Sequence, residues 1–502
     1  MPQSRLIWIG WIVVIALALW LRLHDLELRP IHADEATGAR ILAERLESQS
    51  YRFDPKHFHG PLPSAITVLI ANLRGENSWS ELTVLTLRIG PVLAGILAVL
   101  SPLLWIRHYG QIPTLAAAAL LASSPLLVYY NRMYIHESWL LLFGILALAS
   151  LHRLTTQPNW LRASLTGLCI GLMFATKETF AISIIAWSVV GVCLLIAAQK
   201  HLTITFTKVI GLFLLVSCIA FVTGSFFYSD GFRNWQGIVD SVKTFFLYET
   251  TPGHDKPMGY YLHYLLWPKQ VLGLWWTELF ILLLAAVALL LGILQRSGIG
   301  PYVFLTLATL AHFLIYSLFD YKTPWLPLLP WAHACLLAGL VFAGRKRLRP
   351  SLQIGLTLLF LATFVFQTMQ SFSSIDRYAN DERNPYAYVP TSRDAQRIEH
   401  WLGEINALAD TKPIDTIAVT GADYWPLPWY LRSFENVGYW PEPESDFSLH
   451  PIVFAMPEQV ANCDALLQES HEKFPRTLRS NVPVMLYLRK DIWNLWIQSP
   501  TP

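Results

Sequence analysis

Uninterrupted apolar stretches decide the fold, and the first of them, residues 6–23, reads LIWIGWIVVIALALWLRL. A helix needs about 20 apolar residues to cross the hydrocarbon core of a bilayer. This run approaches that length and contains a single charged residue, Arg22. It carries no small-residue cleavage site, so we expect a retained first membrane span rather than a cleaved signal peptide.

Further runs of the same kind recur along the chain, which has 502 residues, is 54% hydrophobic and is only 14% charged. Soluble domains carry about 25% charged residues. We therefore predict an α-helical polytopic membrane protein with about eleven transmembrane helices. The predicted spans are 6–23, 84–106, 112–128, 137–154, 161–176, 178–198, 204–226, 272–295, 301–318, 326–343 and 352–370.

The composition also divides the chain into two domains. Residues 1–370 form the predicted transmembrane domain, with long outer loops at 24–83 and 227–271, whereas residues 371–502 have the composition of an ordinary soluble protein. In this tail a helical pattern alternates with short strand-like runs, which predicts a small α/β domain. The predicted tail elements are a helix at 394–409 and strands at 414–420, 452–455 and 482–488.

The short loops predict the orientation. With a cytoplasmic N-terminus, eleven cations fall in the inner loops and three, Arg132, Lys177 and Lys322, in the short outer loops. The inner cations are Arg5, Arg107, Arg153, Arg162, Lys200, Lys208, Arg296, Arg345, Lys346, Arg347 and Arg349. The positive-inside rule then predicts a multi-pass plasma-membrane protein whose long loops and C-terminal domain are extracytoplasmic.

Other partners and cofactors receive no support from the sequence. The net charge is only +2, with no extended basic run, so no nucleic-acid partner is expected. The five cysteines lack metal-ligand spacing, and neither a zinc site nor a disulfide framework is predicted.

Candidate chemistry begins in the first outer loop, where Asp34 and Glu35 follow His32. A carboxylate at this level can take a proton from a hydroxyl group. Acidic residues also stabilise the start of a helix without any chemical role, so both interpretations stay open. His57 and His59 would share one face of a strand, which is a weak indication of a metal site.

Four outer-face cations, Arg132, Lys177, Lys256 and Lys322, stand at predicted membrane ends, where a phosphate headgroup would lie. Fixed cations stabilise the charge that grows on a leaving phosphate. The alternative is that such side chains only reach toward the membrane interface. Pro257 restricts the conformation of the loop that carries His254 and Lys256.

These segments, in the same order over nearly the whole chain, resemble the GT-C superfamily of membrane glycosyltransferases, which includes protein O-mannosyltransferases and aminoarabinose transferases. They are most similar to the family named for flippase activity associated with glycosylation clusters. The segments that carry the resemblance are His32–Ala36, His59–Pro61, Tyr129–Arg132 with Glu137, Ala175–Glu178, Gly253–Pro257 with Tyr260 and Tyr261, Tyr321–Trp325, and Asn384–Tyr386.

The resemblance implies a polyprenyl-phosphate-linked sugar as donor, a lipid, glycan or protein hydroxyl as acceptor, and a cavity that opens to the outer face. It implies that Asp34 is the catalytic base and that Glu35 is its neighbour. It also places the segment from Arg132 to Glu137 beside them. Together with the position of the outer-face cations, this predicts that donor phosphate or substrate is bound by Arg132, Glu137, Lys177, His254, Lys256 and Lys322, with His57, His59 and Tyr260 as further candidates. No cofactor is predicted, although some relatives that transfer oligosaccharides need a divalent metal.

Two alternatives remain at this stage. The chain could be an accessory protein of a flippase or transporter without transferase activity, or an inactive scaffold whose soluble domain recruits other enzymes. Ionisable residues lining a path through the membrane would favour the first, and an Asp34 sealed away from any cavity would favour the second.

Overall fold

A computed structural model describes residues 3–197, 205–247, 253–295, 299–344, 348–407 and 414–498. They form two compact units. Unit 1 comprises residues 1–26, 48–74 and 85–378, and unit 2 comprises 27–47, 75–84 and 379–502. The orientation rests partly on Lys200, Arg296, Arg345, Lys346 and Arg347, which lie outside the described residues, and it stays a prediction.

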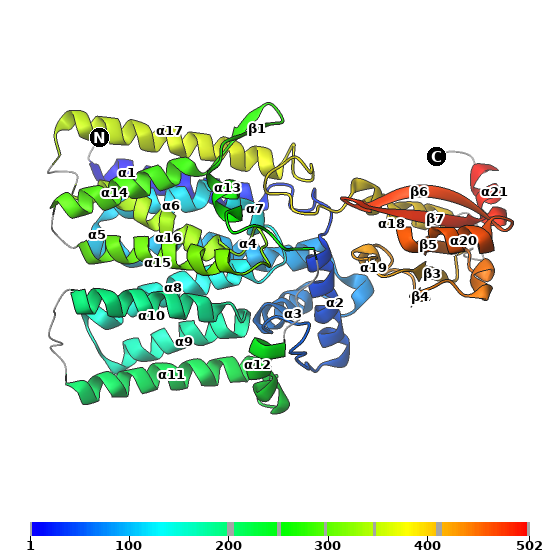
Figure 1. Cartoon of the computed structure of the whole chain (residues 1–502), viewed down its shortest axis with the longest axis horizontal. Helices are drawn as coiled ribbons and strands as arrows, with labels where there is room; N and C mark the ends of the chain where they lie inside the picture. The colour runs from blue at the N-terminus through cyan, green and yellow to red at the C-terminus, as the bar shows by residue number, and fades with distance from the viewer. Residues whose placement is uncertain are drawn as a thin grey trace. The chain divides into compact units, whose positions relative to one another are not determined.

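Unit 1 is a bundle of helices, most of which lie side by side along their length (Figure 1). Its longer helices are α1 (Gln3–Leu23), α4 (Val84–Leu100), α6 (Gln111–Ser123), α8 (Glu137–Thr156), α9 (Trp160–Thr176), α10 (Phe180–Ala197), α11 (Phe206–Tyr228), α14 (Leu279–Gln295), α15 (Ile299–Leu318), α16 (Leu328–Gly339) and α17 (Pro350–Ile375). Shorter elements are α3 (Leu62–Arg74), α5 (Ile106–Tyr109), α7 (Pro125–Tyr130), α12 (Gln236–Leu247), α13 (Tyr260–Leu266), β1 (Lys269–Val271) and β2 (Leu274–Trp276).

The predicted helical membrane architecture is confirmed, but the count of eleven spans is not. Among the described residues, seven helices are long and apolar enough to cross a membrane, and five shorter apolar helices accompany them. One of the shorter helices, α3, lies within residues 24–83, where a loop was predicted, and was not predicted itself.

Two predicted spans are interrupted in the structure, and a third is slightly shortened. The span 112–128 is divided into α6 and α7 because Pro125 lacks the backbone N–H that a continuous helix requires. The span 272–295 begins with the β1–β2 hairpin, whose turn has positive φ at Leu272 and Gly273, so α14 starts only at Leu279. The span 326–343 begins at Leu328 and ends in a short 3-10 turn.

Glycines allow two of the bundle helices to pack closely. A Cβ at Gly167 of α9 would lie 2.6 Å from the carbonyl oxygen of Val216 on α11. One turn later, a Cβ at Gly171 would lie 2.7 Å from the carbonyl oxygen of Ala220. Small residues four positions apart let helix backbones approach in membranes, where van der Waals packing replaces the hydrophobic effect.

Unit 2 contains a five-stranded mixed sheet in the order β4-β3-β5-β7-β6. Its strands are β3 (Ile417–Thr420), β4 (Val437–Trp440), β5 (Ile452–Ala455), β6 (His471–Arg479) and β7 (Val482–Arg489), and its helices are α2 (Ala33–Ser48), α18 (Arg393–Asn406), α19 (Leu427–Tyr430), α20 (Val460–Leu467) and α21 (Lys490–Gln498). Strand β3 pairs in parallel with β4 and β5, whereas β7 is antiparallel to β5 and β6. The predicted tail strands are present, and β4 and β6 were not predicted.

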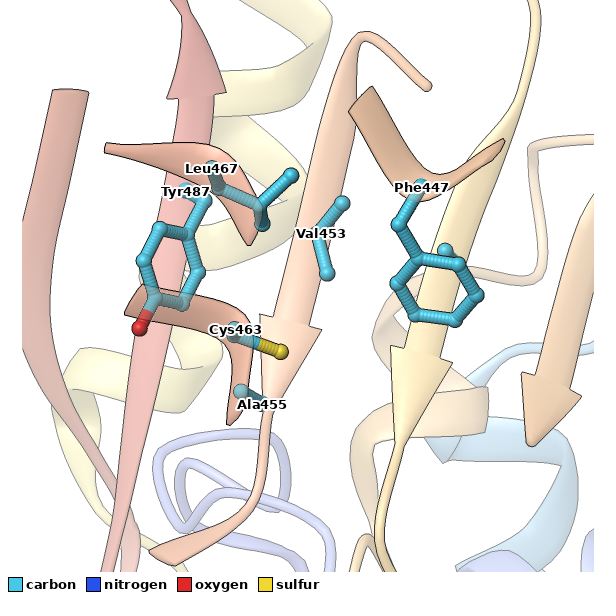
Figure 2. Close-up of a cluster of buried hydrophobic side chains, with 7 residues drawn as sticks. Phe447, Val453, Ala455, Cys463, Leu467 and Tyr487 are labelled. Atoms are coloured by element: carbon cyan, nitrogen blue, oxygen red, sulfur yellow. The ribbon is translucent and has the colours of Figure 1, made fainter. Parts of the chain in front are cut away.

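A compact apolar cluster stabilises this sheet (Figure 2). Val453 and Ala455 of β5, Cys463 and Leu467 of α20, and Phe447 are each fully buried in it. Burying a large aliphatic or aromatic side chain contributes about 1.5–3 kcal/mol, so the cluster supplies unit 2 with a hydrophobic core of its own.

Candidate active site

Asp34 lies in the first turn of α2, with about half of its side chain exposed. Its backbone N–H donates to Nδ1 of His32 over 3.1 Å. The side chain of His32 is largely buried, and its Nε2 lies 3.1 Å from the carbonyl oxygen of Tyr388. Burial lowers the pKa of His32, although the charges of Asp34 and Glu35 act in the opposite direction.

Glu35, the neighbour of Asp34, has a different environment. It is fully buried, and its Oε2 accepts the backbone N–H of His32 over 3.0 Å. Arg29 lies 3.8 Å from the same oxygen. A carboxylate three residues into a helix that bonds back to the preceding backbone N–H satisfies an otherwise unpaired donor. Glu35 therefore has the capping role, and the exposed carboxylate of the pair belongs to Asp34.

In unit 1, the turn at His59–Pro61 lies against the break between α9 and α10. A Cβ at Gly60 would overlap the carbonyl group of Ala175, so a glycine is needed for this close approach. The carbonyl oxygen of Gly60 is 3.2 Å from Nε2 of His136. These contacts bring together three segments that are far apart in the sequence.

Two acid–base pairs result from this approach, of which the first is buried and the second is partly buried. Nζ of Lys177 lies 2.6 Å from Oε1 of Glu137, at the start of α8. Nδ1 of His59 lies 3.1 Å from Oε2 of Glu178. The rings of His59 and His136 meet edge to face, with centroids 5.1 Å apart. The structure thus brings together three residues predicted for the site, His59, Glu137 and Lys177.

The electrostatics of this cluster follow from burial and from the neighbouring charges. Burial alone would raise the pKa of Glu178, but the charge and hydrogen bond of His59, together with Lys177, lower it to about 2. Burial holds the pKa of His136 well below its ordinary value, and the positive charges of His59 and Lys177 lower it further. The cluster favours a charged Glu178 beside a neutral His136.

Arg132 follows α7 and is buried. Its Nη1 donates to the carbonyl oxygen of Leu21 over 3.1 Å, and its Nη2 donates to that of Asp25 over 3.0 Å. Leu21 lies in the last turn of α1, and Asp25 follows the end of that helix. These two carbonyl acceptors hold the guanidinium in place.

Lys256 and Lys322, two cations predicted for the site, belong to segments that are linked by backbone hydrogen bonds. The backbone N–H of Lys322 donates to the carbonyl oxygen of His254, and that of Lys256 to Asp320, each over 3.0 Å. Nζ of Lys322 is buried and donates to the carbonyl oxygens of Lys256, over 2.9 Å, and Phe319. Lys322 therefore holds the loop that carries Lys256.

Aromatic residues border these segments. The ring of His254 lies 5.2 Å from that of Tyr321. Tyr260 begins α13 and stacks on Tyr264 at 5.7 Å. The hydroxyl of Tyr261 donates to the carbonyl oxygen of Thr323, and Glu137 is among the groups that, after burial and nearby tyrosines, raise the pKa of Tyr261.

The pairing expected for His57 and His59 is not observed. Residues 55–57 form a turn rather than a strand, and Nδ1 of the exposed His57 is 2.9 Å from Oδ2 of Asp54. The two histidines thus have different carboxylate partners. Within the described ranges, a group with metal-ligand geometry is His24, Asp25 and Asp376, whose ligand atoms lie within 4.8 Å of one another.

Sequence reasoning missed Glu278, which is fully buried just before α14. Its carboxylate accepts from Oγ of Ser124, from the backbone N–H of Leu126 and from Nε1 of Trp331, over 2.6, 2.8 and 2.6 Å. The residue lay inside a predicted span, and a single acid within an apolar run was the available signal. It connects α14, α16 and the start of α7.

Comparison with known proteins extends these observations. A family model described as dolichyl-phosphate-mannose-protein mannosyltransferase matches residues 58–223, a region that contains His59, Arg132, Glu137 and Lys177. No curated protein sequence matches the chain.

Solved structures resemble the chain over nearly its whole length. ArnT from Cupriavidus metallidurans in the apo state has a TM-score of 0.67 at 15% identity, covering 98% of this chain and 99% of that one. ArnT bound to undecaprenyl phosphate has a TM-score of 0.61 at the same identity and coverage. The oligosaccharyltransferase AglB from Archaeoglobus fulgidus, in complex with an inhibitory peptide and a dolichol-phosphate, has a TM-score of 0.55 at 12% identity, covering 94% and 73%. At these identities the likeness shows a shared fold.

Proposed function

We propose that the chain transfers a sugar from a polyprenyl-phosphate donor to a hydroxyl acceptor at the extracytoplasmic face. The premise is that the chain belongs to the GT-C superfamily of membrane glycosyltransferases, by its fold and by the family model that matches residues 58–223. The predicted superfamily is confirmed, and glycosyltransferase is its enzyme class. The narrower resemblance to the family of glycosylation clusters stays a prediction. ArnT with undecaprenyl phosphate and AglB with a dolichol-phosphate support a lipid-phosphate donor.

In the proposed reaction Asp34 acts as general base. The acceptor hydroxyl transfers its proton to the carboxylate while its oxygen bonds to the anomeric carbon of the sugar. The bond from that carbon to the phosphate oxygen breaks, and the electron pair leaves with the polyprenyl phosphate. A positioned carboxylate contributes about 10²–10⁴-fold to such a step.

The exposure of Asp34 is the observation that carries this assignment. Its side chain is 52% exposed at the first turn of α2, whereas Glu35 is 0% exposed and engaged in the cap. A base needs access to its substrate, and only the first carboxylate of the pair has it.

For the donor phosphate we propose contributions from Arg132, Lys256 and Lys322 of unit 1. Arg132 and Lys322 are held by backbone carbonyl oxygens, so their charges are fixed in position before substrate binds. Charge that is already oriented stabilises a developing phosphate anion without reorganisation. Lys177, whose Nζ contacts Glu137, contributes mainly by holding that carboxylate.

The test is transfer of a labelled sugar from a polyprenyl-phosphate donor by purified protein in lipid nanodiscs. We expect Asp34→Asn to lower turnover at least 10²-fold with unchanged folding. Glu44→Gln is the matched control, because Glu44 is an exposed carboxylate on the same helix. Wild-type turnover in Asp34→Asn would overturn the proposal.

A transport-associated role without transferase activity is the second candidate. The observation that favours it is a pair of buried histidines inside apolar helices, His312 of α15 and His333 of α16, with ring centroids 5.4 Å apart. His312 bonds to the carbonyl oxygen of Ala308 and to Oγ of Ser183. Under this alternative, substituting His312 would abolish activity in vivo while Asp34→Asn would not.

A further inference from the structure

His32 has two hydrogen bonds whose directions determine its protonation. A backbone N–H can only donate, so Nδ1 of His32 accepts from Asp34 and carries no hydrogen. The hydrogen then resides on Nε2, which donates to the carbonyl oxygen of Tyr388. The neutral ring with its proton on Nε2 is the form that makes both bonds.

The residue before His32 is attached to the same tail segment. Oγ1 of Thr391 donates to the carbonyl oxygen of Ile31 over 2.6 Å. Ile31 and Thr391 are each only 1% exposed. Two neighbouring residues before α2 are thus bonded to Tyr388 and Thr391, from a part of the chain about 360 residues away.

The tail segment is itself fixed to the sheet of unit 2. Thr391 forms an isolated β-bridge with Arg479, at the end of β6. The backbone N–H of Ser392 donates to the carbonyl oxygen of Leu478, and Nδ2 of Asn380 donates to that of Thr391. The adjoining motif Asn384–Tyr386 forms a turn in which Oδ1 of the buried Asn384 accepts the N–H of Tyr386.

We propose that His32 is a positioning residue that fixes the catalytic Asp34 to the C-terminal domain, through Tyr388 and Thr391. The inference rests on the proposed function, because it concerns the placement of the proposed base. It gives the soluble tail a part in catalysis: the sheet holds the residues before α2, and these hold the backbone of Asp34. In this proposal the turn at Asn384–Tyr386 supports the segment that bonds to His32.

Acidification provides a test that is specific to this link. A proton added at Nδ1 removes the acceptor for the Asp34 N–H. The charged groups around the ring oppose one another, since Asp34 and Glu35 favour the charged imidazolium whereas Arg29 and burial disfavour it. The wild-type enzyme should therefore lose turnover as His32 becomes charged, in addition to any loss from protonation of the base itself.

Three substitutions test the hydrogen bonds of His32 and of Thr391 separately. His32→Ala removes both, and we expect kcat to fall about 10²-fold with an unchanged KM for the donor, because small misplacements of a catalytic group have effects of this size. His32→Asn keeps an acceptor near the Asp34 N–H and should recover most of the activity. Thr391→Val removes only the hydroxyl and should lower kcat about tenfold, less than additively with His32→Ala.

The pH profile of His32→Asn is the decisive readout. An amide does not titrate, so this variant should lose the part of the acid limb that belongs to the imidazole. A role in folding alone would lower the melting temperature of His32→Ala without altering kcat or the pH profile, and that result overturns the inference. If Asp34→Asn is inactive while His32→Ala keeps wild-type kcat, the function stands and the positioning role fails; if Asp34→Asn is active, the function itself fails.

Discussion

The candidate carboxylates of unit 1 and the candidate carboxylate of unit 2 have different surroundings. Glu137, in unit 1, is buried and lies 2.6 Å from Lys177, and Glu178, in the same unit, is partly buried and lies 3.1 Å from His59. Asp34, in unit 2, is half exposed, and its contact with His32 is made mainly through the backbone. A carboxylate that a buried cation already balances is costly to protonate, whereas an accessible one can exchange a proton with substrate.

The difference shows that a carboxylate's place in a family-like segment does not reveal whether the carboxylate is buried in an ion pair or accessible to a substrate. Each of the three belongs to a segment that carries the family resemblance, yet their burial and pairing differ, and on that basis we propose separate roles for them. Stability measurements should respond to Glu137 and Glu178, and turnover should respond to Asp34.

The largest effect on stability should come from breaking the Glu137–Lys177 pair. Lys177→Met leaves the Glu137 carboxylate buried without its Nζ partner, which costs about 3–5 kcal/mol. The double variant Glu137→Gln/Lys177→Met removes both charges and should recover much of that loss. Unfolding of the purified protein by denaturant compares both variants with the wild type. A single variant as stable as the wild type would show that the pair is not structural.

The His59–Glu178 pair should make stability depend on pH. The pKa of Glu178 is about 2 in the folded protein, against 4.5 for an ordinary glutamate side chain, so the unfolded chain takes up this proton at higher pH. The stabilisation is fully present above about pH 4.5 and is lost as the pH falls toward 2; it is on the order of a few kcal/mol.

Glu178→Gln provides the control for this pH dependence. The variant has no carboxylate to titrate, so its unfolding midpoint should fall less steeply than that of the wild type between pH 5 and 3. Identical slopes for the two proteins would exclude Glu178 as the titrating group.

Gly60→Ala should have a smaller effect. The added Cβ overlaps the backbone of Ala175, so the turn must move away from the break between α9 and α10, at about 1–3 kcal/mol. The movement separates His59 from Glu178, and the acid sensitivity of the variant should therefore decrease as well. Gly191→Ala, where a Cβ meets open space, is the matched control.

Much of unit 1 could be predicted because membrane helices are recognised in a sequence by their long apolar runs. The errors have local causes: Pro125 divides one run, and the turn at Leu272–Gly273 delays another. In the tail, β4 and β6 were missed because β4 contains Gly438 and β6 alternates exposed polar residues around Pro475. Edge strands of this kind have little hydrophobic signal.

The candidate site could be predicted as a set of residues but not as a set of contacts. The sequence indicated Lys177 as a phosphate ligand, and the structure places its Nζ beside Glu137, 40 positions away. It suggested His57 and His59 as a pair, and they bond to different acids. Such pairings depend on long-range packing, for which one sequence carries no periodic signal.

The smallest effect should come from His57→Ala, which sharpens the contrast between an exposed and a buried pair. His57 and Asp54 are 60% and 41% exposed, so their contact is screened by water and contributes about 0–1 kcal/mol. His59 and Glu178 are 23% and 15% exposed, and His59→Ala leaves the buried carboxylate without its partner. Denaturant unfolding should therefore show a clear loss of stability for His59→Ala and almost none for His57→Ala. Equal losses would mean that burial does not separate these two histidines, and with them the distinction between structural and accessible acids would weaken.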